Sequence, residues 1–206
     1  MRASRRNLLR SAGLASVVGV LPSVLANKVS AHNDPGRVQP PAPVPALNLT
    51  LHDGRKAQLK DLLSGRITAL QLMFTGCSAT CPIQGALFRQ VQEQTKSEAG
   101  LQLISVSIDP LNDDPKAMRA WLKRFDASDH WLGATPDFKQ LERWFEFLRA
   151  RNAGADRHTP QVYFFNSLGE LALRSTDFPA PEDIARLMKA AKASAQTDSI
   201  QKKSKA

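Results

Sequence analysis

Cys77 and Cys81 are the only cysteines in this 206-residue chain, and three residues separate them in Phe74-Thr-Gly-Cys-Ser-Ala-Thr-Cys-Pro82. If a helix begins after Cys77, with Pro82 in its first turn, the two side chains share one helix face about 5 to 6 Å apart. Two such sulfurs can close a disulfide or bind one soft metal ion. A helix N-terminus also lowers a thiol pKa, so we expect at least one partly ionised thiol near neutral pH.

A purely structural disulfide is the simplest alternative for this pair. The loop that it would close is very short, and chain-entropy scaling gives it about 2 kcal/mol, against about 4 to 5 kcal/mol for a bridge that spans a hundred residues. A chain of this length does not need that small stabilisation. The spacing, position and scarcity of the cysteines therefore favour redox or metal chemistry.

The residues around the cysteines predict the elements that position them. An apolar run over 69–74 predicts a buried strand, and Ile83, Leu87 and Val91 recur at helical spacing in a helix that ends near Gly100. The other predicted elements are a hairpin of 47–51 and 56–59 around Asp53-Gly54, a strand over 101–108, helices that begin at Pro115 and after Pro136, a hairpin of 162–165 and 170–174, and a last helix through 184–191.

This order of elements predicts an α/β protein with a central mixed sheet flanked by helices, an N-terminal hairpin and a helical insertion. Parallel strands with right-handed helical crossovers, closed by an antiparallel hairpin and a last helix, form a thioredoxin-like arrangement. In that fold the cysteines lie after the first central strand, at the start of its helix. Open sheets bind their ligands at this edge.

We divide the chain into four segments. Residues 1–31 form a signal peptide, in which Ser4-Arg5-Arg6-x-Leu8-Leu9-Arg10 resembles a twin-arginine export signal. The following stretch is too short for a confident membrane span, although an uncleaved basic anchor is an alternative. Residues 32–45 form a proline-rich spacer, 46–193 the thioredoxin-like domain, and 194–206 a basic flexible tail. We therefore expect a periplasmic protein with at most peripheral membrane association.

The charge of the chain excludes some partners. The formal net charge is +9, but a signal that ends at Ala31 removes five positive and no negative charges and leaves +4. With a single tyrosine and no pattern of stacking aromatic residues, nucleic-acid binding has little support. The periplasm is oxidising, so a metal-binding dithiol there needs a thiol reductant or early metal loading.

One of the four histidines is placed to complete a metal site. His32, His52 and His130 are predicted to be surface residues. His158 directly precedes the hairpin strand that a thioredoxin-like fold brings alongside the cysteine loop. Soft copper sites often combine thiolate and imidazole ligands, so His158 is the candidate third ligand.

Three blocks of this sequence resemble the Sco/SenC family, the thioredoxin-like copper proteins that help to assemble the binuclear copper centre of cytochrome c oxidase. The blocks are 74–82, 104–110 with Asp113 and Pro115, and 158–163 with the segment to Gly169. The likeness extends from about Leu47 to Met188.

The resemblance implies that Cys77, Cys81 and His158 bind copper as Cu(I) or Cu(II), and that Asp109 lies near the site. Asp109 could equally cap the turn that follows it. The implied partners are a copper-containing oxidase subunit or another copper enzyme, a copper donor protein and a thiol reductant. Two features depart from many relatives: Ser78 replaces a proline, and the signal resembles a twin-arginine signal rather than a membrane anchor.

The leading hypothesis is a periplasmic copper-binding assembly factor, a metallochaperone. The alternative is a thiol-disulfide oxidoreductase that keeps the copper-site cysteines of a client reduced, with Cys77 as nucleophile and Cys81 as resolving thiol. Thr159-Pro160 is relevant to this alternative, because thioredoxin-like oxidoreductases place a cis-proline opposite the dithiol. A peroxidase is a third reading. Whether the chain is an enzyme therefore stays open at this point.

The twin-arginine assignment predicts that replacing Arg5 and Arg6 together by lysine blocks export, because recognition depends on the arginine pair rather than on charge. Cell fractionation with detection of the processed form measures this. A double variant that still reaches the periplasm with normal processing would contradict the assignment.

Overall fold

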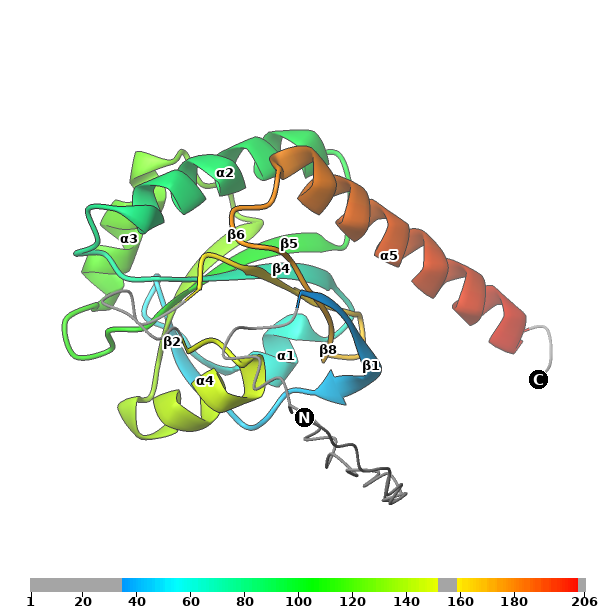
Figure 1. Cartoon of the computed structure of the whole chain (residues 1–206), viewed down its shortest axis with the longest axis horizontal. Helices are drawn as coiled ribbons and strands as arrows, with labels where there is room; N and C mark the ends of the chain where they lie inside the picture. The colour runs from blue at the N-terminus through cyan, green and yellow to red at the C-terminus, as the bar shows by residue number, and fades with distance from the viewer. Residues whose placement is uncertain (1–34, 152–158, 204–206) are drawn as a thin grey trace, which may run out of the picture.

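The computed structural model describes residues 35–151 and 159–203, which form one mixed sheet with helices on both faces (Figure 1). The eight strands lie in the order β1-β8-β7-β4-β5-β6-β2-β3. The central strands β4 (Ile67–Met73), β5 (Leu101–Ser107) and β6 (Trp131–Pro136) are parallel. The antiparallel pairs involve β1 (Gly36–Pro43), β2 (Asn48–Leu51), β3 (Lys56–Gln58), β7 (Val162–Phe165) and β8 (Glu170–Arg174).

The helices divide into two layers (Figure 1). One face of the sheet packs against α2 (Thr80–Thr95), α3 (Pro115–Arg124) and α5 (Pro181–Lys203), around a core that includes Phe88, Trp121 and Trp131. The other face packs against α1 (Leu59–Leu63) and α4 (Leu141–Leu148), which follows the short 3-10 helix η1 (Phe138–Gln140). The sheet therefore separates two hydrophobic cores.

Strand β4 leads directly to the cysteines. All seven of its residues are buried, because both faces of the strand are covered. Side chains alternate across a strand, so Ala69 and Met73 enter the core beneath α2 while Leu70 and Leu72 enter the opposite core. The parallel register pairs Met73 with Ser107, so β4 and β5 end side by side.

The predicted α/β architecture is confirmed. The N-terminal hairpin forms from β2 and β3, and β7 pairs with β8 as predicted. The helix expected at Pro115 begins there, because the Asp114 carboxylate caps it by accepting a hydrogen bond from the Ala117 N–H at 2.7 Å. The helical insertion after Pro136 is η1 and α4.

The N-terminal spacer prediction was wrong for residues 36–43. This segment is β1, which pairs antiparallel with β8, although its register shifts between Arg37 and Ala42. Prolines argued for an unpaired spacer, but β1 is the outermost strand, and an edge strand tolerates residues that cannot donate a ladder hydrogen bond.

Two other elements were missed because their stability depends on tertiary contacts. Strand β6 contains Gly133 and ends at Pro136, which weakens its sequence signal, yet it lies between β5 and β2. Helix α1 begins at Leu59, where the second hairpin strand was expected to end. Leu59 and Leu63 are both fully buried, so packing stabilises this single turn and a half.

The flexible tail predicted for 194–206 was also wrong in part, because α5 continues to Lys203. The apolar periodicity ends near Ala191, but no glycine or proline follows to stop the helix. Lys192 on this helix forms an ion pair with Glu98, with Nζ and Oε2 2.8 Å apart. Within the described part of the chain, no helix is long and apolar enough to cross a membrane.

Candidate metal and redox site

The cysteine loop, residues 74–79, connects the end of β4 to α2 at the carboxyl edge of the parallel strands. The Cys77 N–H donates to the Phe74 carbonyl at 3.2 Å, which closes a tight turn within the loop. Cys77 and Cys81 are both free thiols in this structure. A dithiol is thus present where the sheet topology favours a ligand site.

The start of α2 brings the two cysteines together. The helix begins at Thr80, two residues later than expected from a helix directly after Cys77, and Pro82 lies in its first turn as predicted. Ala79 is the N-cap residue and offers no side-chain acceptor to the free N–H groups of the first turn. The Cys77 sulfur takes this role, because it accepts a hydrogen bond from the Cys81 N–H at 3.4 Å.

The two thiols have opposite environments. Cys77 is half-buried, and although burial opposes its ionisation, hydrogen bonds from Cys81, the Ala79 backbone and the Thr80 hydroxyl group lower its pKa below the ordinary value. Cys81 is fully buried in the core beneath α2, and this burial raises its pKa to about 12. Cys77 is therefore the more accessible and more acidic thiol, and Cys81 is a protonated thiol behind it.

Two aspartates follow β5, and they have different partners. Asp109 accepts hydrogen bonds from the Asn112 side-chain amide at 3.0 and 2.9 Å, so its contacts lie within its own turn. This agrees with the capping alternative for Asp109. Asp113 is buried and accepts hydrogen bonds from Thr75 in the cysteine loop. The sequence placed Asp113 in one of the blocks that resemble the family and did not predict this contact.

His158, the candidate third ligand, lies outside the described residues. The chain that follows it is placed by the antiparallel pairing of β7 with β4, in which Val162 is opposite Gln71. The residues before Val162 therefore lead towards the carboxyl end of β4, where the cysteine loop begins. Within the described ranges the cis peptide bond is Gln39–Pro40, so the Thr159–Pro160 bond is not cis.

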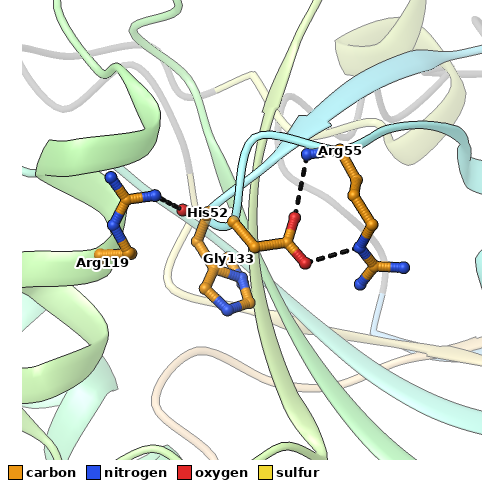
Figure 2. Close-up of polar contacts among 5 residues, drawn as sticks. His52, Arg55, Arg119 and Gly133 are labelled. Atoms are coloured by element: carbon orange, nitrogen blue, oxygen red, sulfur yellow. Dashed lines mark hydrogen bonds and ion pairs between the residues drawn. The ribbon is translucent and has the colours of Figure 1, made fainter.

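Two other histidines have contacts or positions away from the cysteine loop. Figure 2 shows His52, whose Nδ1 accepts a hydrogen bond from the Gly133 N–H at 3.3 Å and whose carbonyl accepts one from Arg119. Beside it, Arg55 forms an ion pair with Asp53 at 2.6 Å. His52 is half-buried rather than on the surface, whereas His130 is exposed as predicted.

No group of three histidine, cysteine or acidic side chains within 35–151 and 159–203 is arranged to bind a metal ion. The described part of the site thus supplies two sulfur ligands.

Because the two thiols have different environments, we expect Cys77 and Cys81 to differ in their reactivity towards an alkylating reagent. With iodoacetamide, Cys77 should react with a pH midpoint below that of an ordinary cysteine, because hydrogen bonds lower the pKa of its thiol. Cys81 should stay unmodified in the folded protein, because it is fully buried and its pKa is about 12. Mass spectrometry of digests across a pH series measures both sites, with urea-unfolded protein as the control in which both react. Equal rates in the folded protein would contradict the assignment.

Comparison with known proteins gives the same fold and family. A SCO1 protein homolog of Bacillus subtilis is 32% identical over 81 residues, which are 38% of this chain and 42% of that protein. This alignment thus spans less than half of that relative. A SCO1/SenC family lipoprotein from Bacillus anthracis has a similar structure, with a TM-score of 0.65, 23% identity, and coverage of 75% of this chain and 99% of that one.

The structure of Bradyrhizobium japonicum ScoI with copper bound is also similar, with a TM-score of 0.61, 23% identity, and coverage of 73% of this chain and 99% of that chain. These likenesses confirm the predicted thioredoxin-like fold. The family model described as SCO1/SenC matches residues 39–193, a range that contains both cysteines and His158. Because this match covers most of the chain, the protein belongs to the SCO1/SenC family.

Proposed function

We propose that this protein is an exported copper-binding assembly factor that carries Cu(I) on Cys77 and Cys81, with His158 as the third ligand. The observation that carries the proposal is the free dithiol, in which the Cys81 N–H contacts the Cys77 sulfur at 3.4 Å. Two neighbouring sulfurs suit a soft ion of low coordination number, and imidazole suits copper as well. Family membership supports the choice of copper, since one structural relative has copper bound.

The unequal thiols suggest the order in which copper is bound. The half-buried Cys77 meets the incoming ion first, because it is more accessible and its pKa is lowered. Cys81, with a pKa of about 12, is protonated at neutral pH and must lose its proton to become a ligand. Copper uptake should therefore release at least one proton per ion bound. In the reverse direction, protonation of Cys81 helps to release copper to the thiolates of a client.

We infer export from the N-terminal arginine pair, which lies in residues 1–34, outside the described part of the chain. The Bacillus anthracis relative is a lipoprotein, which is consistent with action outside the cytoplasm. In this proposal the copper comes from a donor protein and passes by ligand exchange to an oxidase subunit or another copper enzyme. A thiol reductant keeps Cys77 and Cys81 able to bind the ion.

The same asymmetry favours one second candidate, a thiol-disulfide oxidoreductase. The Cys77 thiolate would attack one sulfur of a client disulfide, form a mixed disulfide and release one client thiolate. Cys81 would then lose its proton and attack the Cys77 sulfur, which releases the second client thiolate. The client gains two electrons, the protein ends as a Cys77–Cys81 disulfide, and the thiol reductant restores it. In both candidate functions Cys77 reacts first, with the incoming copper ion in one and with the client disulfide in the other.

The variant His158→Ala separates these two functions. Imidazole matters strongly to Cu(II) and less to a Cu(I) ion that two thiolates hold. We expect Cu(II) affinity to fall by at least the 10- to 100-fold that is typical when a group supporting a metal ligand is lost. Oxidase assembly in a complemented deletion strain should fail, whereas the Cys77–Cys81 disulfide should still form.

The exposed His130 provides the matched control, because His130→Ala removes an imidazole away from the cysteine loop. Competition titration with Cu(II), the dithiol redox midpoint and oxidase activity are measured for both variants. Unchanged Cu(II) affinity in His158→Ala would remove His158 from the site. Intact oxidase assembly alongside lost copper binding would instead favour the oxidoreductase.

A further inference from the structure

Asp113 carries a buried carboxylate at the base of the cysteine loop. The residue is 3% exposed, and both of its side-chain oxygens accept hydrogen bonds. The donors are the Thr75 N–H, at 3.2 and 3.1 Å from the two oxygens, the Thr75 hydroxyl at 2.5 Å and the Ser107 hydroxyl at 2.6 Å. Among the described residues it forms no ion pair. A buried carboxylate is costly unless several donors satisfy it, and here they do so.

These contacts join the ends of three neighbouring strands. Thr75 follows β4 by two residues, and Ser107 is the last residue of β5, which pairs with the last residue of β4. The Asp113 backbone carbonyl also accepts a hydrogen bond from the Thr135 hydroxyl of β6 at 2.9 Å. The point at which the cysteine loop leaves the sheet is thus held by the side chain and backbone of one residue, Asp113.

The neighbouring aspartates have contacts that differ from those of Asp113. Asp114 caps α3, and Asp109 binds Asn112 within its own turn. Asp113 makes neither of these contacts, and its carboxylate reaches across to a loop 38 residues earlier in the chain. Its side-chain bonds therefore join the end of β5, at Ser107, to the cysteine loop, at Thr75.

The loop needs such an anchor because its own bonds are few. Between Thr75 and the start of α2 the chain contains Gly76 and the exposed residues Ser78 and Ala79. The Cys77 N–H bonds to the Phe74 carbonyl, so the orientation of Cys77 depends on how the chain is held at Phe74 and Thr75. A metal site is most effective when its ligands are held before the metal arrives.

We propose that Asp113 is a positioning residue that clamps Thr75 and so holds the Cys77 sulfur in place for copper. This inference rests on the proposed copper-binding function of the dithiol. In this proposal Asp113, rather than Asp109, supplies the carboxylate that organises the site. Asp113 acts through hydrogen bonds to the loop and does not itself contact the ion.

The test uses Asp113→Asn and Thr75→Val in the full-length mature protein, alone and combined, with Asp114→Asn as the matched control. Asp113→Asn keeps the shape of the side chain but loses the charged acceptor, and Thr75→Val removes one donor while the carboxylate remains. Asp114→Asn changes an exposed aspartate one residue away and keeps a side-chain acceptor for the α3 cap, because asparagine caps a helix about as well as aspartate. If Asp113→Asn folds poorly, the milder Thr75→Val variant still tests the clamp.

Three quantities are measured for each variant: Cu(I) affinity by anaerobic competition with a chelator, hydrogen exchange of the Thr75 and Cys77 amides, and stability to urea. We expect Asp113→Asn and Thr75→Val each to weaken Cu(I) binding about 10-fold or more. Each change should also accelerate the hydrogen exchange of the Thr75 and Cys77 amides. The double variant should lose little more Cu(I) affinity than Asp113→Asn alone, because both changes break the same contact. Asp114→Asn should leave the Cu(I) affinity and the hydrogen exchange of these amides unchanged.

Unchanged Cu(I) affinity in Asp113→Asn and Thr75→Val, or an equal loss in Asp114→Asn at matched stability, would overturn the proposal. Additive losses in the double variant would also overturn it, because they would show two independent effects. If the unmodified protein binds no Cu(I), the proposed function fails instead. The amide exchange of Thr75 and Cys77 then still shows whether Asp113 holds the loop.

Discussion

The hydrogen bond from the Cys81 N–H to the Cys77 sulfur, 3.4 Å long, is the contact on which the chemistry of this protein depends. It satisfies an N–H group at the start of α2 and stabilises negative charge on Cys77. Cys81 itself lies in the core beneath α2, where burial keeps that thiol protonated. The hydrogen bond and the burial together give an accessible, more acidic thiol beside a buried, weakly acidic one.

This contact depends on the sheet, which positions the cysteine loop at the end of β4. β4 is buried on both faces and ends beside β5, so the chain must leave the sheet at a defined point before it enters α2. β7 lies on the other side of β4 and runs antiparallel, which directs the segment that follows His158 towards the same edge. In the two functions that we propose, this scaffold presents the same two sulfurs either to a metal ion or to a client disulfide, so the two uses would compete.

The sequence predicted the parts of this arrangement that depend on local patterns. The apolar run before Cys77 and the helical spacing of Ile83, Leu87 and Val91 placed the dithiol between a strand and a helix. Sequence could not show which thiol is buried, because that depends on where α2 starts and what packs beneath it. It also missed β6 and β1, whose pairing is tertiary, and the bond from Asp113 to Thr75, which spans 38 residues. His158 stays a prediction, since it lies outside the described residues.

The most direct measurement is an anaerobic Cu(I) titration of the mature protein in two forms, with the dithiol fully reduced and with Cys77 and Cys81 joined in a disulfide. The account predicts one tightly bound Cu(I) in the reduced form and none at this site in the oxidised form, because the disulfide consumes both thiolates. Equal copper uptake by the two forms would contradict it and would show that copper binds elsewhere on the protein.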